Sequence, residues 1–262
     1  IVGLSAGLAV GANVRIAHFI GAGEQKKIPD VVHTGMLFSV LYGVLFGALG
    51  QLISKPLLML IHTPADILTS ADNYLRIYFA GVPFLMIYNF GAAILRAAGE
   101  TKGPLYYLTI AGVVNVVLNL IFVVIFHMDV AGVALATAIS QALSAVLVLL
   151  ALARRMDACR LVFSKLHIYK KPLLQIVRIG LPAGIQGSLF SISNVLIQSS
   201  VNSFGSVVMS GNAAAGNIEG FVYNSMNAVY QTSLSFTSQN MGARKYQNLS
   251  RVVLNCLPVS YT

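Results

Sequence analysis

The stretch that decides the fold is VRIAHFIGAGEQKKIPDVV, Val14 to Val32, because a related stretch, SFTSQNMGARKYQNLSRVV, returns at Ser235 to Val253. The two align without gaps at an offset of 221 residues. The identical pairs between Phe19 and Val32 are Gly21/Gly242, Ala22/Ala243, Val31/Val252 and Val32/Val253. Each copy closes one long apolar segment, passes a polar basic turn and opens another. Such a repeat predicts two related halves in a membrane protein.

Composition places the chain among membrane proteins. Hydrophobic residues make up 56% and charged residues 10%, and the mean hydropathy is +0.77. A soluble domain carries about 25% charged residues, so this chain has too little charge to cover a water-facing surface. The net charge of +9 does not indicate nucleic acid as a partner, because the basic residues lie in short connectors between apolar segments.

Eight apolar segments follow one another along the chain. They are Ile1–His18, Val31–Ile53, Tyr74–Leu95, Pro104–Phe126, Val130–Ala153, Ile176–Val201, Val207–Phe236 and a run from about Leu249. The complete segments approach or exceed the ~20 residues that a spanning helix needs, and their continuous apolarity excludes barrel strands. We predict an all-α fold, a polytopic membrane helical bundle with two pseudo-repeated lobes.

The basic residues predict the orientation. If the connector 15–30 faces the cytoplasm, strict alternation places all 17 Lys and Arg there except Lys55 and Arg76. We expect an N-lobe over residues 1–153, a basic cytoplasmic linker over 154–175 and a partial C-lobe over 176–262. Because the sequence begins and ends within apolar segments, we expect a piece of a longer chain, with the N-lobe nearly complete and the C-lobe truncated. Cys159 and Cys256 predict no disulfide framework.

Five motifs in order resemble the multidrug and toxic compound extrusion (MATE) family. They are FIGAGEQKK at 19–27, LRAAGETKGP at 95–104, VAGVALATAIS at 130–140, IGLP at 179–182 and QNMGARKYQN at 239–248. The resemblance implies helix 2 to the start of helix 9 of a twelve-helix transporter, whose two lobes surround a cavity that opens alternately to each side. It implies a monomeric multi-pass protein of a prokaryotic cytoplasmic (inner) membrane. The expected activity is secondary antiport of organic cations or drugs against Na⁺ or H⁺.

A polar cluster is predicted between the fourth and fifth apolar segments. Asn115 and Asn119 are four residues apart, so both amides lie on one helix face. Many members of the family hold a cation- or proton-linked site with an Asn, an Asp four residues later and a Thr one helix on, and Asn115, Asn119 and Thr137 match these positions. Asn119 replaces the Asp, and an amide oxygen can ligate Na⁺ but carries neither charge nor titratable proton. The alternative role is interhelical hydrogen bonding.

Glu219 is the one acid in the middle of an apolar run. A carboxyl at that depth is expected to line the C-lobe cavity as a proton carrier or as the counter-charge of a cationic substrate. Alternatively, Glu219 lies near the outer interface. Polar side chains along the fifth to seventh apolar segments predict a wet substrate cavity, with contacts from Gln141, Gln186, Asn194, Asn217, Asn224 and Tyr230.

Glycines four residues apart predict close helix contacts. The sets are Gly3/Gly7/Gly11, Gly43/Gly47, Gly180/Gly184 and Gly216/Gly220.

Other function classes have less support. An enzyme is not expected, because the sequence has no glycine-rich phosphate loop and no metal-ligand spacing of His, Cys or acids. No cofactor is expected beyond the coupling ion. The two-half repeat favours a carrier over a channel, because it is the pattern of alternating access. A lipid-linked oligosaccharide flippase, from a more distantly related family with similar lobes, stays open. It would favour a basic cavity, whereas the cavity candidates are neutral or acidic, so small organic cations are the expected partners. Membrane lipids are the other expected partners. The basic linker would face anionic headgroups, and the alternative for this linker is a solvated loop that sets the topology.

Overall fold

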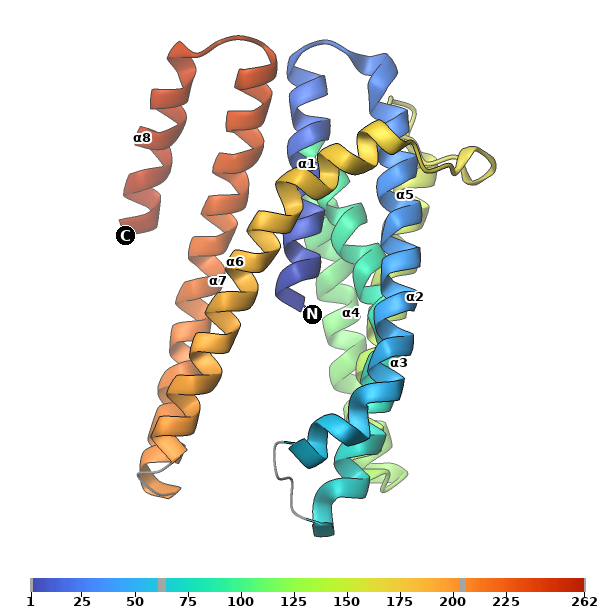
Figure 1. Ribbon diagram of the computed structural model, residues 1–262, viewed down its shortest axis with the longest axis vertical. Helices are drawn as coiled ribbons and strands as arrows, with labels where there is room; N and C mark the ends of the chain where they lie inside the picture. The colour runs from blue at the N-terminus through green and yellow to red at the C-terminus, as the bar shows by residue number, and fades with distance from the viewer. Residues whose placement is uncertain (1, 61–64, 203–205, 262) are drawn as a thin grey trace. The chain divides into compact units, whose positions relative to one another are not determined.

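The computed structural model describes residues 2–60, 65–202 and 206–261, and within them the chain is helical with short connectors and no strand (Figure 1). The helices are α1 (Val2–Gly21), α2 (Ile28–Leu60), α3 (Ala65–Ala97), α4 (Lys102–Leu120), α5 (Asp129–Arg154), α6 (Lys170–Asn202), α7 (Ser206–Gly242) and α8 (Gln247–Tyr261). Short turns are η1 (Gln25–Lys27), the π-helical η2 (Ile121–Ile125) and η3 (Phe163–Lys165). Each predicted apolar segment forms one helix, so the all-α prediction is confirmed.

Six helices in the described ranges are long and apolar enough to cross a membrane. The candidate spans are Gly3–Gly21, Gln25–Met59, Leu68–Ala97, Lys102–Ile125, Asp129–Arg154 and Lys170–Asn194. Helix α7, with 37 residues, is longer than any of them but is not among the six. It carries the amides and hydroxyls that predicted a wet cavity.

The chain forms two compact units. One contains residues 1–28 and 175–262, and the other contains residues 29–174. Helix α1 therefore belongs to one unit with α7, α8 and most of α6, whereas α2 to α5 and the connector 155–169 belong to the second unit. The lobe boundaries predicted from the sequence stay a prediction.

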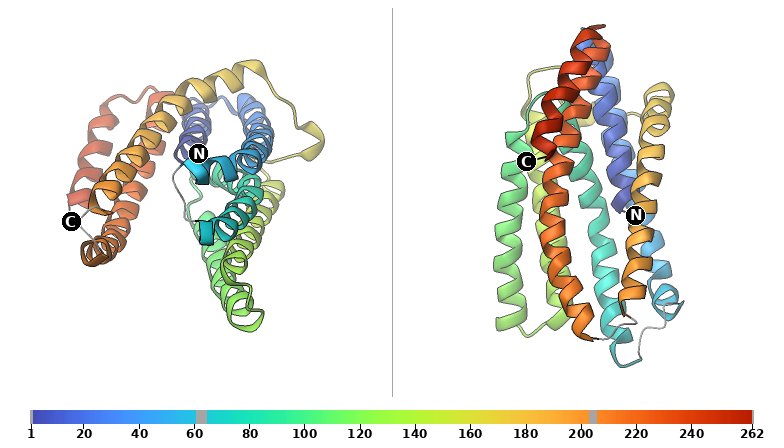
Figure 2. Two further views of the ribbon diagram at one scale, coloured as in Figure 1. Left: turned by 60° about the horizontal axis from the view of Figure 1, so that its bottom comes forward. Right: turned by 90° about the vertical axis from the view of Figure 1, so that its left-hand side faces the viewer.

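The core of the second unit is centred on α3. Met86, Phe90 and Ile94 follow one another at four-residue spacing and are fully buried. Helix α3 packs most extensively against α5, where Val148 and Leu152 are buried. On its other side, α2 approaches so closely that a side chain at Gly43 would meet the backbone of Pro83. Helix α4 lies along α5, as both views in Figure 2 show.

Glycines permit the close contacts of the first unit. A Cβ at Gly7 would collide with the backbone of Gly184, and one at Gly180 would lie 2.6 Å from Leu8 Cα. These contacts on α1 and α6 and those of Gly43 and Gly47 confirm the prediction of close helix approach. For the pair Gly216/Gly220 the prediction was wrong, because an added Cβ meets no described atom within 4 Å. These two glycines lie on an open face of α7.

The two copies of the repeat have the same local structure. Gly23 and Arg244 are equivalent at the offset of 221 residues, and both have left-handed backbone, with φ of 70° and 58°. The first copy has backbone hydrogen bonds from Ala22 N to His18 O, Gly23 N to Ile20 O, Glu24 N to Phe19 O and Lys27 N to Glu24 O. The second copy has the equivalent bonds, from Ala243 N to Gln239 O, Arg244 N to Met241 O, Lys245 N to Asn240 O and Asn248 N to Lys245 O. The repeat inferred from four identities is therefore a structural repeat.

Candidate functional site

Helices α4 and α5 bring together three of the predicted cation-linked residues. The Asn115 Nδ2 group donates to Thr137 Oγ1 at 3.5 Å and to Ser140 Oγ at 3.2 Å. Asn119 Nδ2 donates to Asn115 Oδ1 at 3.0 Å. One chain of hydrogen bonds therefore joins two turns of α4 to α5 within the second unit.

This series of hydrogen bonds ends at the side-chain amide oxygen of Asn119. Asn119 Oδ1 is buried and has no hydrogen-bond partner within the part of the chain that is described. Asn119 lies in the last turn of α4, directly before the π-helical turn Ile121–Ile125. Such turns are rare and occur frequently at functional sites. A buried oxygen without a donor is a position where a cation or a water proton would be accepted.

The oxygens of this cluster are neutral. Thr137 Oγ1 donates to Val133 O at 2.9 Å and Ser140 Oγ donates to Thr137 O at 2.9 Å, so both hydroxyls keep lone pairs for acceptance. Over the described residues, no three His, Cys, Asp or Glu side chains lie close enough to share a metal ion. Amide and hydroxyl oxygens can ligate a monovalent cation, but they cannot carry a proton across the membrane.

Two residues of α5 modify the predicted set. Ser140 is buried and accepts a hydrogen bond from Asn115, although the sequence analysis did not select it. Its spacing of three residues from Thr137 was the signal that could have found it. Gln141 does not hydrogen-bond to the cluster. Its Oε1 atom is buried, lacks a partner among described residues and lies beside Gly81 of α3.

The remaining candidates lie in the first unit. Glu219 is exposed, about 20 Å along α7 from its start at Ser206. Gln186 and Asn194 on α6, and Asn224 and Tyr230 on α7, are also exposed. The Asn217 side chain lies outside the described part of the structure. Phe190 and Tyr223 stack with ring centroids 5.7 Å apart, which places α6 beside α7. The roles of these residues as cavity contacts stay predictions.

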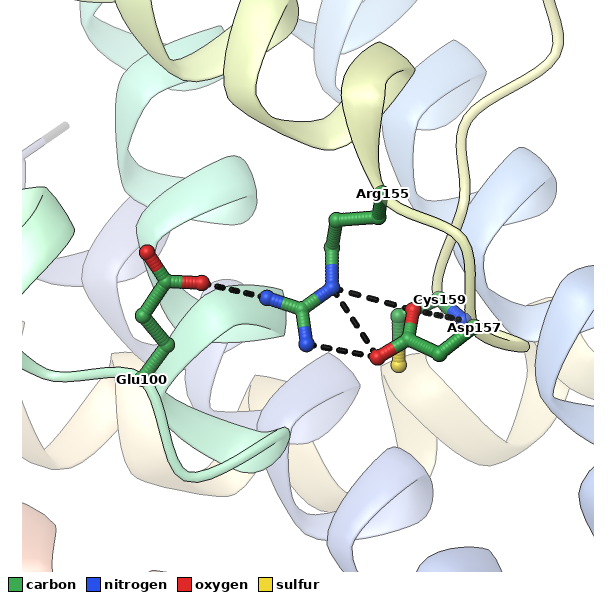
Figure 3. A network of polar contacts seen from close by, with 4 residues as sticks. All are labelled: Glu100, Arg155, Asp157 and Cys159. Atoms are coloured by element: carbon green, nitrogen blue, oxygen red, sulfur yellow. Dashed lines mark hydrogen bonds and ion pairs between the residues drawn. The ribbon is translucent and has the colours of Figure 1, made fainter.

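A network of charges that the sequence analysis did not predict fixes the connector after α5 (Figure 3). Arg155 Nη1 lies 2.5 Å from Glu100 Oε2, and Arg155 Nη2 lies 2.5 Å from Asp157 Oδ2. The hydrogen bonds from Arg155 hold the pKa of the Asp157 carboxyl below its ordinary value. Asp157 Oδ1 accepts from the backbone N–H of Cys159, whose thiol has its pKa raised to about 12 by burial.

Two polar side chains of α2 hold the same connector from its other side. His33 Nε2 accepts from the backbone N–H of Val162 at 3.1 Å, and His33 Nδ1 lies 2.6 Å from Pro29 O. Thr34 Oγ1 accepts from Tyr169 N at 3.1 Å. The basic linker predicted over residues 154–175 is thus attached to the helices at both ends.

Comparison with known proteins gives consistent matches along the chain. The family model described as MatE matches residues 1–121. The probable multidrug resistance protein YpnP of Bacillus subtilis is 34% identical over 222 residues, covering 85% of this chain and 49% of that protein. The probable multidrug resistance protein YoeA of the same organism is 26% identical over 260 residues, covering 97% and 56%. The chain therefore spans about half the length of the curated relatives it matches.

The solved structures agree on the fold. A transporter of the MOP superfamily from Pyrococcus furiosus superposes with a TM-score of 0.88 at 22% identity, covering 98% of this chain and 57% of that chain. At this identity, the likeness concerns the fold alone.

Proposed function

Because this chain belongs to the MatE family, we propose that it forms part of a secondary exporter that moves organic cations or drugs out of the cell in exchange for Na⁺ or H⁺. Members of this family are transporters and not enzymes, so the prediction that the chain is no enzyme is confirmed. The prediction of a multi-pass protein of a bacterial inner membrane is confirmed in the same way, and the six apolar helices agree with it.

The observation that carries the proposal is the structural repeat. The two copies form equivalent turns after α1 and α7, six helices apart, so helices that cross the membrane alternately would place both turns on the same face, as expected for halves related by an axis along the membrane normal. In transporters built from such repeats, the substrate site lies between the halves and the two halves rock about it. The names of the two Bacillus relatives, multidrug resistance proteins, support drugs as cargo.

Cation cargo and coupling are proposed from the charges of the candidate residues. Glu219 is the one acid among the substrate and cation candidates, and a carboxylate attracts organic cations and repels anions. The cluster around Asn119 offers a buried oxygen that no described residue donates to, which supports a bound Na⁺. The oxygens of this cluster carry no proton, so among the candidate residues of this chain Glu219 is the one that could couple export to H⁺.

The test is efflux of a fluorescent organic cation from cells that express the full-length protein, with the Na⁺ and H⁺ gradients collapsed one at a time. We expect efflux to stop with one of the two gradients and to fall at least about tenfold in Glu219→Gln. The matched control is Asp66→Asn, which removes the same charge at the start of α3. The protein with this substitution should transport normally.

Two outcomes contradict the proposal. Efflux that persists with both gradients collapsed excludes secondary antiport. The absence of efflux under any gradient, with the protein present in the membrane, favours the flippase alternative and leaves the Asn115–Asn119 cluster a packing contact. Normal efflux by Glu219→Gln removes that residue from the mechanism without affecting the assignment of antiport.

A further inference from the structure

An open groove of about 330 Å³ lies between α4 and α5 at the end of α5 where the basic connector begins. Its lining residues are Glu100, Tyr107, Leu147, Leu150, Ala151, Arg154 and Arg155. Four of them, at positions 147, 150, 151 and 154, recur at three- and four-residue spacing and so form one face of α5. The groove is apolar along its length and charged at one end.

The apolar part of the groove lies on an apolar surface. Leu150 is 46% exposed, and on neighbouring α4 the exposed side chains include Leu105, Tyr106 and Leu108. Both helices are candidate membrane spans. In a membrane, such surfaces are in contact with acyl chains. The charged end coincides with the face that the Lys and Arg distribution assigns to the cytoplasm, which is the level of lipid headgroups.

The charged end offers one free cation and one free carboxylate oxygen. Arg154 is exposed and has no ion-pair partner among the residues that the structure describes. Glu100 uses Oε2 to bind Arg155, and its Oε1 has no hydrogen bond within the described ranges. Arg155 is already shared between Glu100 and Asp157, so it does not neutralise a further anion.

We propose that this groove binds phosphatidylethanolamine, with the phosphate on Arg154, the ammonium group on Glu100 and an acyl chain along Leu147 and Leu150. The charge pattern selects this lipid. A purely anionic headgroup would pair with Arg154 but would face the Glu100 carboxylate. A choline headgroup has the correct charges, but its methylated nitrogen has no N–H to donate to the free oxygen. Phosphatidylethanolamine satisfies both groups.

The experiment is native mass spectrometry of the full-length protein in detergent, titrated with phosphatidylethanolamine, phosphatidylcholine or phosphatidylglycerol of identical acyl chains. We expect phosphatidylethanolamine to bind about fivefold more tightly than the other two, the factor typical of one partly exposed charge pair. Glu100→Gln should abolish the preference over phosphatidylcholine. Arg154→Gln should weaken binding of all three lipids.

Two control variants separate the groove from its surroundings. Arg160→Gln removes an exposed cation of the same connector that does not line the groove, and its lipid preference should be unchanged. Asp157→Asn weakens the Arg155 network without altering a lining residue, so a preference that survives this change assigns the effect to Glu100 itself.

The proposal is overturned by any of three results: phosphatidylglycerol binds as tightly as phosphatidylethanolamine, all three lipids bind equally, or Asp157→Asn abolishes the preference as Glu100→Gln does. The first would indicate an anion site, the second an unspecific surface and the third an effect of the network on the connector's fold.

Discussion

Gly21 and Gly242 pack reciprocally where α1 and α7 cross. The backbone of Gly21 lies against the carbonyl of Gln239, and the backbone of Gly242 lies against the carbonyl of His18. His18 and Gln239 are themselves equivalent in the repeat, so each half presents the same surface to the other. This is the relationship found at a two-fold axis, here between two parts of one chain.

Gly21→Ala and Gly242→Ala should each destabilise the protein. In both cases the new Cβ meets backbone atoms that cannot rotate away, and such overpacking costs about 1–3 kcal/mol. Since both substitutions separate the same pair of helices, the double variant should lose less than the sum. The melting temperature of the purified full-length protein measures the effect. Gly112→Ala is the matched control, because its Cβ meets nothing within 4 Å and it should leave stability unchanged or slightly raised.

Arg244→Gly should stabilise the second turn. Arg244 has φ of 58°, a left-handed conformation that glycine adopts without strain and that its counterpart Gly23 already adopts. We expect a gain of about 0.5–1 kcal/mol in the free energy of unfolding, and a loss of similar size for Gly23→Ala. The neighbouring change Lys245→Gly relieves no positive φ and should not stabilise. If Arg244→Gly and Lys245→Gly changed the stability equally, the role of backbone strain at Arg244 would be contradicted.

Asp157→Asn should destabilise the protein at neutral pH, and its effect should shrink as the pH falls below the unfolded pKa. The folded-state pKa of Asp157 is depressed by hydrogen bonds from Arg155, so its contribution is fully present above the unfolded pKa of about 3.9 and is lost as the pH falls through the folded value. Because the side chain is 48% exposed, the contribution is below about 1 kcal/mol. Thermal unfolding of both proteins across this pH range tests the sign. A difference that grows on acidification would contradict the network.

Cys159 should resist alkylation in the folded protein. Its side chain is buried, with 2% exposed, and its pKa is raised to about 12, so almost no thiolate is present at neutral pH. In a Cys256→Ser background, we expect maleimide labelling of Cys159 to be on the order of 100-fold slower than labelling of a cysteine introduced by Met156→Cys, a fully exposed position of the same connector. Labelling in denaturant should equalise the two. Equal rates in the folded state would show that the connector is not held against the helices.

Asn119→Asp should change the ion dependence of efflux. The substitution places a titratable, negatively charged group where the buried, unpartnered amide oxygen now lies. We expect efflux to become more dependent on the Na⁺ concentration or the external pH, with half-maximal Na⁺ lowered at least about threefold. Asn73→Asp, an exposed position on α3, is the control. An unchanged ion dependence would remove the cluster from coupling.

The sequence predicted the site in part because local spacing carries some contacts and not others. Asn115 and Asn119 share a helix face, so their mutual hydrogen bond follows from a separation of four residues. The contact of Ser140 with Asn115 depends on how α5 packs on α4, so spacing along the sequence does not predict it. Spacing placed Gln141 four residues from Thr137, but only the packing of α5 on α3 brings its amide beside Gly81.

The sequence by itself determined the helices, the membrane class and the repeat, because continuous apolar runs, low charge and a fixed offset are local properties that any fold of this chain must satisfy. The tertiary structure alone decided that Gly21 and Gly242 meet, that the Asn119 side-chain oxygen finds no donor among the described residues and that Arg155 joins Glu100 to Asp157. Each of these depends on the rotation and the approach of one helix to another. Those quantities are set by side-chain packing across the whole unit, which residue spacing along the chain does not contain.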